Sequence, residues 1–480
     1  MDKSMTVESK TSTESRKVDD KYLGKRFHLI GVGGVGMRAL GKMLMMRGAC
    51  VSGSDIEPSA ALNDLACHGA KIAIGQRADN IPQNCDTVVY SVAIKPDNPE
   101  LLAAKERGIE LVKYSKMLGR LMSDKKGIAI AGTHGKSTTS AMIAYALVQA
   151  GKDPSFVIGA DVDQLGGPSG IGSGEYFVAE ACEYDRSFLN LTPTLAAILN
   201  IEEDHLDYYA DISEIISAFS AFAEKVSPEG VLIGNGQDKH VASVLQNARC
   251  CWEMFGLDER CHWRAENLTS NRGRYSFDVF YHDKRLCSIS LRLAGLHNVY
   301  NALTAIAVLY HAGLSVEEIV QAISSFEGVQ RRMTLKAQLG GISVVDDYAH
   351  HPTEIQVTLR AVVDYYQPRR TWCVFQPHQH SRTRFLLKDF ARSFSLADEV
   401  IVPDIYFVRD SQLEKENISS ADLVAQICLN GGKAIYLQSF DAIVEHLKKN
   451  LTPGDLVITM GAGDIWKVAD EIVQWLGTNR

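Results

Sequence analysis

A short glycine-bounded loop ending in lysine and serine carries the clearest chemistry in this 480-residue chain. It lies between a strand-like apolar run, 127–131, and a helix-like run, 138–150. Backbone N–H groups of such a loop, with the positive end of the following helix, surround phosphate oxygens. The loop is two residues shorter than the general pattern G-x-x-x-x-G-K-[ST], because Ile130 stands where that pattern has glycine. We assign nucleotide contacts to Gly132, Thr133, His134, Gly135, Lys136, Ser137 and Thr138.

A second glycine cluster follows the strand-like run 27–30 and fits G-x-G-x-x-G at residues 31–36, with an aspartate about one helix and one strand later. Glycines there let the backbone approach a pyrophosphate, either of NAD or of a nucleotide sugar; a structural tight turn is the alternative. Because another phosphate loop lies downstream, we favour a diphosphate of a substrate over NAD. The assigned substrate-binding residues are Gly31, Gly33, Gly34, Gly36, Asp55 and Ser91.

Acidic and imidazole side chains follow two further apolar runs, 176–179 and 195–199. Mg²⁺ prefers hard oxygen ligands, so Ser137 and Glu180 beside phosphates suit it; a solvated strand-end acid is the alternative for Glu180. His205 is expected to contact a second metal ion or to shape the site, unless it is a hydrogen-bonded core histidine. Two more acids fall on a predicted loop and are expected to be exposed: Glu183 and Asp185.

The last third of the chain places a dense polar cluster, 346–354, after an apolar run. So many ionisable groups are unusual for a mere turn. The adjacent His350 and His351 suggest a transition-metal site, but consecutive side chains diverge and no third ligand has zinc-site spacing, so we do not predict one. Arg382 lies in a basic segment after another strand and can hold a carboxylate through paired N–H donors, with a solvated helix start as the alternative.

Two residues between these segments have side chains suited to a nucleotide. Asn298 begins a helix, where its amide either reads a base edge or caps the helix. Arg332 lies at a predicted domain junction, where it either folds over phosphate as domains close or forms an interdomain salt bridge.

Composition excludes several classes of protein. The 50 Lys+Arg and 58 Asp+Glu give a net charge of -8 without long single-sign blocks, which argues against a nucleic-acid partner. No apolar stretch is long enough for membrane insertion, and the first twenty residues lack the apolar core of a secretory signal. Ten cysteines at irregular spacing, with no C-x-x-C pair, favour reduced thiols in a cytoplasmic protein. We expect a monomer or a homodimer.

Strand-like and helix-like runs alternate over most of the chain, which predicts an α/β fold with parallel sheets. The best strand candidates are 27–30, 88–91, 128–131, 176–179, 195–199, 342–345, 372–375, 400–402 and 456–459. Ligands collect beyond the carboxyl ends of parallel strands, where most of the candidate site residues lie. We predict a disordered polar tail at 1–20 and domains at 21–124, 125–332 and 333–480.

Taken in order, the motifs resemble those of the Mur ligase family from about residue 21 to the C-terminus. They are HLIGVGGVGM from His28, GTHGKST from Gly132, DHLDYY from Asp204, HNVYNA from His297, VQRRM from Val329, DDYAHHPTE from Asp346 and FQPHQHSRT from Phe375. The ordered series is far more specific than any one member. The family's shortened phosphate loop also accounts for Ile130.

The resemblance implies an N-terminal Rossmann-like domain for a UDP-sugar, a central P-loop ATPase with a mostly parallel sheet, and a C-terminal Rossmann-like domain that closes over an amino acid. It implies ATP and Mg²⁺ as cofactors. The members that this chain resembles most join L-alanine to the carboxylate of UDP-N-acetylmuramate through an acyl phosphate, in peptidoglycan precursor synthesis.

The resemblance also implies a role for each of several residues. By analogy Lys136 grips phosphate, Ser137 and Glu180 hold Mg²⁺, His205 approaches a second Mg²⁺, Asn298 contacts adenine, Arg332 and Asp347 bind nucleotide after closure, and His350 and Arg382 lie near alanine. The expected catalytic set is Lys136, His205, His350 and Arg382.

The chain departs from the family pattern at four positions. Cys182 and Tyr184 replace Asp and Ser, Gln76 stands where a histidine often follows glycine, and Gln379 stands where arginine is common. The last change bears most on amino-acid specificity. Three other functions compete: a sister ligase that attaches murein tripeptide, although FQPHQHSRT favours alanine; a nicotinamide dehydrogenase; and a nucleotide-regulated binding module without catalysis.

Overall fold

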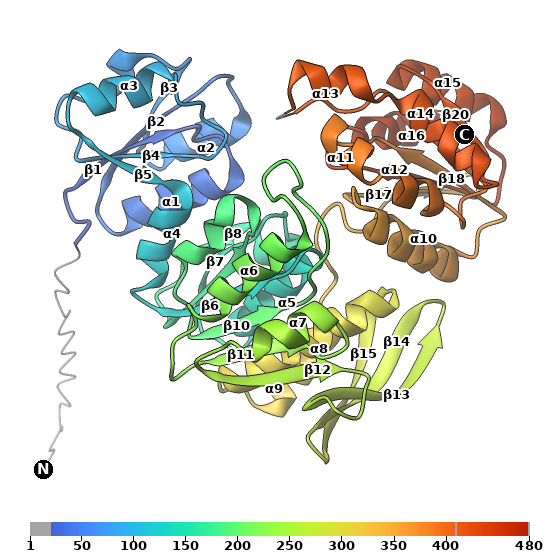
Figure 1. Cartoon of the computed structure of the whole chain (residues 1–480), viewed down its shortest axis with the longest axis horizontal. Helices are drawn as coiled ribbons and strands as arrows, with labels where there is room; N and C mark the ends of the chain where they lie inside the picture. Colours follow the sequence, from blue (N-terminus) through green and yellow to red (C-terminus); the bar gives the residue numbers. More distant parts are fainter. Residues whose placement is uncertain (1–20, 409, 479–480) are drawn as a thin grey trace, which may run out of the picture. The chain divides into compact units, whose positions relative to one another are not determined.

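The computed structural model describes residues 21–408 and 410–478, so the tail predicted at 1–20 lies outside the described residues. The described residues form three β-sheets with intervening helices (Figure 1). The chain divides into two compact units that meet between Tyr114 and Ser115. The α/β prediction is therefore confirmed. Within the described ranges no helix is both long and apolar enough to cross a membrane.

The N-terminal unit is built on a parallel five-stranded sheet in the order β3-β2-β1-β4-β5. Its elements are β1 Arg26–Ile30, α1 Val35–Met46, β2 Cys50–Asp55, α2 Ala60–Cys67, β3 Lys71–Ile74, β4 Thr87–Tyr90, α3 Pro99–Glu106, β5 Glu110–Lys113 and, at the boundary, α4 Tyr114–Met122. The strand order reverses between β1 and β4. Ligands of open α/β sheets bind at such a switch point, and the glycine cluster follows β1 there.

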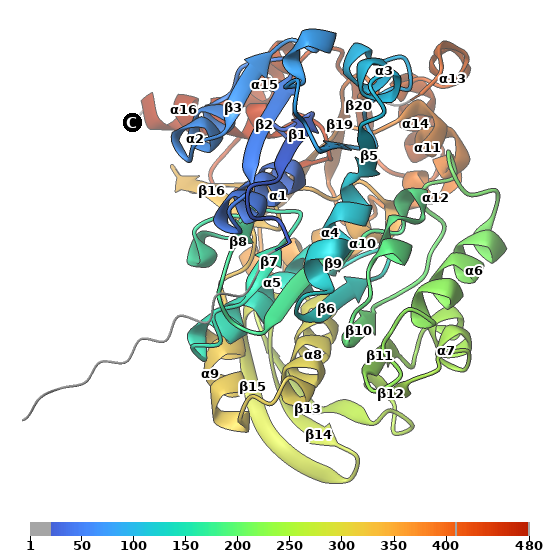
Figure 2. The ribbon, with the colours of Figure 1, turned by 90° about the vertical axis from the view of Figure 1, so that its left-hand side faces the viewer.

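The central sheet has ten strands in the order β15-β14-β13-β12-β11-β10-β6-β9-β7-β8. Its elements are β6 Lys126–Ala131, α5 Lys136–Gln149, β7 Ser155–Val157, β8 Ser169–Gly170, β9 Tyr176–Ala181, β10 Leu195–Ile198, α6 Ile212–Ala223, β11 Val231–Asn235, α7 Lys239–Leu245, β12 Cys251–Gly256, β13 Trp263–Asn271, β14 Arg274–Tyr281, β15 Lys284–Ala294, α8 Leu296–His311 and α9 Val316–Ser325. Counted across the sheet, the neighbouring strands β13, β12, β11, β10, β6, β9 and β7 are all parallel. Strand β8 is antiparallel to β7, and the hairpins formed by β13, β14 and β15 are antiparallel. Helices α5 and α8 pack together in its core (Figure 2).

One buried carboxylate ties the antiparallel arm to α8. Glu253 accepts hydrogen bonds from Trp263 Nε1 at 2.6 Å and Tyr281 Oη at 2.8 Å, and pairs with His311 Nε2 at 2.8 Å. Burial alone would raise its pKa, but these partners outweigh burial and lower the pKa of Glu253 to about 2. The side chain is therefore held as an anion within the core.

We predict that this carboxylate makes the central domain sensitive to acid. Because the pKa is near 4.5 in the unfolded chain and about 2 in the folded one, stability of about 3 kcal/mol is present above pH 4.5 and is lost as the pH falls toward 2. The fall in Tm between pH 6 and pH 3.5 should be smaller in Glu253→Gln than in the wild type. The control Glu266→Gln changes a half-exposed acid on β13 that pairs with Arg264, and it should keep the wild-type fall; equal falls in all three would contradict the prediction.

The C-terminal sheet has the order β16-β17-β21-β18-β19-β20 and is parallel except at β16. Its elements are β16 Thr334–Leu339, β17 Ile342–Asp347, α10 Pro352–Tyr366, β18 Arg370–Phe375, α11 His380–Phe385, α12 Leu387–Arg392, β19 Glu399–Val402, α13 Gln412–Asn417, α14 Ser420–Leu429, β20 Ala434–Tyr436, α15 Phe440–Asn450, β21 Asp455–Met460 and α16 Trp466–Thr478. Successive residues of a strand pack into two different apolar clusters: Val345 and Cys373 lie in one, and Val344 and Trp372 lie in the other. Burial on both faces explains the continuous apolar runs.

All nine strand candidates coincide with strands of the structure. The strands that the sequence analysis did not predict include β2, β3 and the arm β12–β15. These strands have more polar sequences or lie at sheet edges. The boundaries expected at 124/125 and 332/333 fall between consecutive sheets and stay predictions.

Candidate active site around the phosphate loop

The phosphate loop joins the end of β6 to the start of α5 and requires glycine at both ends. Gly132 has φ +140° and Gly135 has φ +83°, values that side chains disfavour. A Cβ on Gly132 would lie 2.9 Å from the Leu199 Cβ. Asn200, just after β10, holds the loop because its Oδ1 accepts the His134 N–H at 2.7 Å. The first turn of α5 therefore presents backbone donors at the carboxyl edge of the sheet, as an anion site needs.

We predict that Gly135→Ala impairs nucleotide binding more than it impairs folding. The added Cβ would lie 2.5 Å from Asn301 Oδ1, and Asn301 in turn donates to Asn298 Oδ1 at 3.1 Å, so the substitution displaces both amides. We expect the KM for ATP to rise about tenfold, with about 1–2 kcal/mol of backbone strain. The control Gly151→Ala also has positive φ, +66°, but open space around it. Gly151→Ala should lose similar stability but keep the wild-type KM for ATP. If the KM for ATP rose equally in both variants, backbone strain alone would be responsible.

Lys136 is partly buried, with its side chain 16% exposed, and is already surrounded by oxygen atoms. Its Nζ donates to the carbonyls of Gly132 and Thr133 and lies 3.0 Å from both carboxylate oxygens of Glu183. Burial would lower the pKa of Lys136, but Glu183 outweighs burial and raises it. The lysine is thus a permanent cation at the loop. Glu183 is 3% exposed, so the expectation of an exposed acid at this position is wrong: its loop folds back onto the phosphate loop.

The three expected metal ligands come from neighbouring segments at one sheet edge. Ser137 lies in the first turn of α5 after β6, and Glu180 lies on β9, which pairs with β6 so that Glu180 is opposite Ile130. His205 follows β10, with Nε2 3.8 Å from Glu183 Oε1, and its Nδ1 is buried without a hydrogen-bond partner. His205 also has φ +54°, a strained conformation of the kind found at functional sites. The carboxylate, hydroxyl and unpaired imidazole nitrogen form a donor set that fits Mg²⁺.

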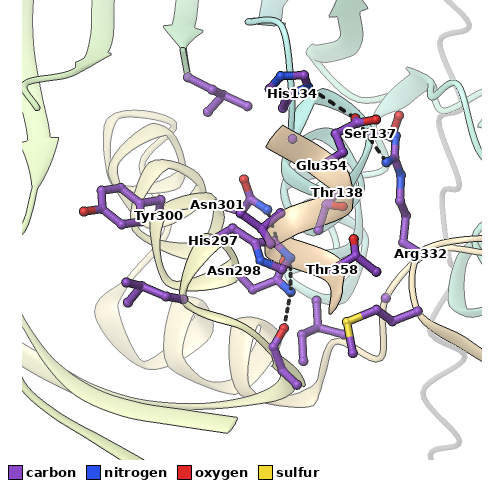
Figure 3. A pocket seen from close by; sticks show the side chains of 18 of the residues that line it. His134, Ser137, Thr138, His297, Asn298, Tyr300, Asn301, Arg332, Glu354 and Thr358 are labelled. Atoms are coloured by element: carbon purple, nitrogen blue, oxygen red, sulfur yellow. Dashed lines mark hydrogen bonds and ion pairs between the residues drawn. The ribbon is translucent and has the colours of Figure 1, made fainter. Parts of the chain in front are cut away.

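A cavity of about 710 Å³ opens beside the loop (Figure 3). Seven of the predicted nucleotide-binding residues line it: His134, Gly135, Ser137, Thr138, Asn298, Arg332 and Asp347. Asn298 is buried, and its side chain is oriented by donation to the Ala294 carbonyl at 2.8 Å and by acceptance from Asn301. Burial and the charge of Arg332 lower the pKa of neighbouring His297 to about 4, so that ring is neutral. The far wall is therefore a pair of fixed amides beside a neutral imidazole, suited to a base.

Glu354, on α10, joins three groups that the sequence left separate. Its Oε1 lies 3.3 Å from His134 Nδ1 and 3.4 Å from Arg332 Nη1 (Figure 3). Its Oε2 lies 3.2 Å from His350 Nδ1. Burial would raise its pKa, but the cations Arg332 and His134 hold the pKa of Glu354 well below its usual range. Glu354 thus links the phosphate loop to the C-terminal domain. Its place at the start of a helix concealed this role, because acids are common there.

Arg332 and Asp347 flank the domain junction. Both neighbours of Arg332 have positive φ, +58° at Arg331 and +50° at Met333, so the backbone turns sharply and aims Arg332 at the cavity. Asp347 ends β17 and accepts the Met333 and Ala349 N–H groups at 2.7 Å each. Burial raises the pKa of Asp347 to about 6, although Arg332 opposes this.

His350 and Arg382 converge near the central domain rather than in the cavity. Arg382 is 6% exposed and donates from Nε and Nη2 to Asp204 Oδ1, at 3.0 and 2.9 Å, while its Nη1 lies 3.2 Å from His378 Nδ1. The rings of His378 and His350 are 6.1 Å apart. Burial lowers the pKa of His350 to about 4, outweighing Glu354. An arginine and two imidazoles therefore surround one region between the two domains.

The structure shows the surroundings of the four residues that depart from the family pattern. Tyr184 packs its ring 5.0 Å from that of His205, and Cys182 lies beside Glu183. Gln76 accepts from Asn98 Nδ2 at 2.6 Å. Gln379 is 1% exposed and occupies the N-cap position of α11 with φ +70°, but its side chain makes no capping hydrogen bond and its Nε2 has no hydrogen-bond partner.

The glycine cluster of the N-terminal unit forms a separate site at the switch point. Asp55 Oδ2 accepts the Gly33 N–H at 2.7 Å, so the acid holds the loop itself. A Cβ on Gly31 would lie 3.9 Å from the Ser91 Cβ, and one on Gly36 would lie 2.5 Å from Tyr114 Oη. Gly34 precedes the first turn of α1. The six predicted substrate-binding residues are thus grouped around the ends of β1, β2 and β4.

Three family models match successive parts of the chain. They are described as the Mur ligase family catalytic domain, at residues 26–126, the Mur ligase middle domain, at 130–309, and the Mur ligase glutamate ligase domain, at 331–463. The chain belongs to the Mur ligase family. Each of the three sheets of this Mur ligase lies largely within one matched segment.

Individual relatives cover almost the whole Mur ligase chain. A curated protein of Alkaliphilus metalliredigens, named UDP-N-acetylmuramate--L-alanine ligase, is 42% identical over 95% of this chain and 98% of its own length. The solved UDP-N-acetylmuramate-alanine ligase of Thermotoga maritima is 26% identical, with TM-score 0.78 over 95% of this chain and all of that one. A solved murein peptide ligase of Psychrobacter arcticus is also 26% identical, with TM-score 0.72 over the same shares.

The structure thus brings most of the predicted residues of the Mur ligase into two groups, one around the cavity and the other at the end of the N-terminal sheet. Sequence reasoning left two partners unassigned: Glu183 and Glu354. Glu183 is distant in sequence from Lys136, and Glu354 is distant from His134.

Proposed function

We propose that this Mur ligase joins L-alanine to the carboxylate of UDP-N-acetylmuramate, converting ATP to ADP and phosphate, in peptidoglycan precursor synthesis. The observation that carries the proposal is near-full-length identity of 41–44% to curated relatives that bear that ligase name. The site supports it, because the lysine of the phosphate loop and, lining the cavity, a helix N-terminus and paired amides suit a nucleoside triphosphate.

The reaction needs an activated acid, because a carboxylate oxygen is a poor leaving group. In the first step an oxygen of the sugar carboxylate attacks the γ-phosphorus, the bond to the bridging oxygen breaks, and ADP leaves. Lys136 offsets charge on the transferring phosphoryl group, and the N–H groups of the loop orient it. The amine then attacks the acyl carbon, phosphate departs and the amine loses a proton, so no serine or cysteine nucleophile is required.

Ser137, Glu180 and His205 are the residues that would hold Mg²⁺, since the hydroxyl, carboxylate and unpaired nitrogen fit the ion. Bound there, Mg²⁺ would neutralise phosphate charge. Arg332 and Asp347 would close over the nucleotide with the C-terminal domain, which excludes water from the acyl phosphate. His350 and Arg382 would hold the amino acid, and the neutral His350 adds no positive charge beside the incoming ammonium group.

The acceptor specificity is tested by comparing free alanine with murein tripeptide. The purified chain, UDP-N-acetylmuramate, ATP and Mg²⁺ are combined with L-alanine, glycine, L-serine or the tripeptide, and phosphate release and product mass are measured. We expect a product one alanine heavier, and a kcat/KM at least about 100-fold higher for alanine than for tripeptide. Faster reaction with tripeptide would favour the sister ligase. The solved structures alone do not separate the two, because both kinds are 26% identical.

We also propose a cytoplasmic enzyme, monomeric or homodimeric. All ten cysteines are free thiols, as is usual for proteins kept in a reducing compartment. A sedimentation measurement with and without nucleotide determines the oligomeric state.

A further inference from the structure

A cluster of two imidazoles and a carboxylate lies between the central and C-terminal domains, apart from the expected Mg²⁺ ligands. It comprises His134 on the phosphate loop, Glu202 after β10, and His351 at the start of α10. One ligand atom from each lies within 4.8 Å of the other two. The sequence argument against a metal at the vicinal histidines assumed that no third ligand was near. The tertiary structure overturns that premise.

The distances are close to those of a tetrahedral zinc site. Glu202 Oε2 lies 3.5 Å from His134 Nε2 and 3.8 Å from His351 Nδ1. Ligand atoms about 2.0–2.1 Å from a tetrahedral zinc ion are about 3.3 Å apart, so small rotations would complete the site. The two rings are 4.7 Å apart and tilted, which lets both nitrogens face the carboxylate.

The second partners of both rings turn the other nitrogens toward Glu202. His134 Nδ1 faces Glu354 at 3.3 Å and its Nε2 faces Glu202 at 3.5 Å; these two carboxylates outweigh burial and raise the pKa of His134 to about 9, so a bound cation must displace the Nε2 proton. Histidine ligands of metals commonly use their other nitrogen in this way, with a carboxylate or a carbonyl. His351 Nε2 lies 3.1 Å from the Glu203 carbonyl, which leaves a lone pair on Nδ1. That lone pair accepts the Thr353 N–H at a long 3.3 Å.

We propose that a zinc-like transition-metal cation binds His134 Nε2, Glu202 Oε2 and His351 Nδ1 and clamps the phosphate loop to the C-terminal domain. Two nitrogen donors favour such cations over Mg²⁺, which prefers oxygen. The fourth position is left for water. Metal coordination would replace the weak Thr353 contact and hold the domains together, so turnover of a ligase that must open for release would slow.

The test uses Co²⁺ as a spectroscopic probe on the full chain in excess Mg²⁺, without nucleotide, so that it does not depend on the proposed ligase activity. We expect one equivalent to give a weak visible band without thiolate charge-transfer absorption, and a rise in Tm. His351→Asn should weaken binding at least about tenfold, because asparagine can still cap α10 but lacks the ring nitrogen. Glu202→Gln should do the same.

The control is His68→Asn, which removes an exposed histidine in the N-terminal unit and should leave the titration unchanged. Unaltered affinity in both His351→Asn and Glu202→Gln overturns the proposal, as does the absence of Co²⁺ binding. A strong charge-transfer band that persists in those variants also overturns it, because the metal would then sit on exposed cysteines.

Discussion

Replacing Lys136 by methionine is expected to lower the rate of ADP formation that depends on UDP-N-acetylmuramate and L-alanine by roughly 10³-fold or more. Methionine has similar length but no charge, so the phosphoryl group loses the cation placed at the loop by the contacts with Gly132 and Thr133. The measurement is ADP release with all substrates present, together with single-turnover phosphorylation. The loss should be in kcat, because charge on the transferring group is greatest in the transition state.

Two controls separate this effect from unfolding. Lys126→Met changes an exposed lysine on β6, paired with Glu175, and should keep full activity. Lys136→Met leaves Glu183 buried without its cation, which itself destabilises the chain. The double variant Lys136→Met, Glu183→Gln should recover Tm and remain inactive. Near wild-type turnover in either Lys136 variant would refute the assigned role.

Replacing Arg382 by methionine should have the next largest effect, on both stability and amino-acid use. Arg382 holds the pKa of buried Asp204 well below its usual range against the effect of burial. Removing the guanidinium leaves that carboxylate without its cation, which costs about 3 kcal/mol. We expect kcat/KM for L-alanine to fall about 100-fold, because the amino-acid carboxylate loses its partner.

The double variant Asp204→Asn, Arg382→Met distinguishes substrate contact from structural pairing. Asparagine keeps the oxygen that accepts the His205 N–H at 2.7 Å, and the uncompensated charge is gone. Thermal unfolding should therefore return toward the wild type while kcat/KM for alanine stays low. Recovery of activity along with Tm would show that Arg382 acts only by neutralising Asp204.

Local pattern was enough for nine strands buried within the sheets and for the ends of the phosphate loop. Apolar runs such as 128–131 and 342–345 lie in sheets buried on both faces, so hydrophobicity alone marks them. Gly132 and Gly135 were recognisable because only glycine suits their backbone angles and the close approach of Leu199 and Asn301. Edge strands such as β3, with half-exposed residues, gave no such signal.

The sequence by itself determined the α/β class, the order of the motifs and the chemistry of the phosphate loop, since these depend on residues close together in the chain. Only the tertiary structure decided which charges meet. Glu183 is buried against Lys136, 47 positions away, and Glu354 joins Arg332 and His350 to His134, 220 positions away. Which long-range pairs form depends on how the sheets and domains pack, because burying a charge is costly unless the fold places an opposite charge beside it.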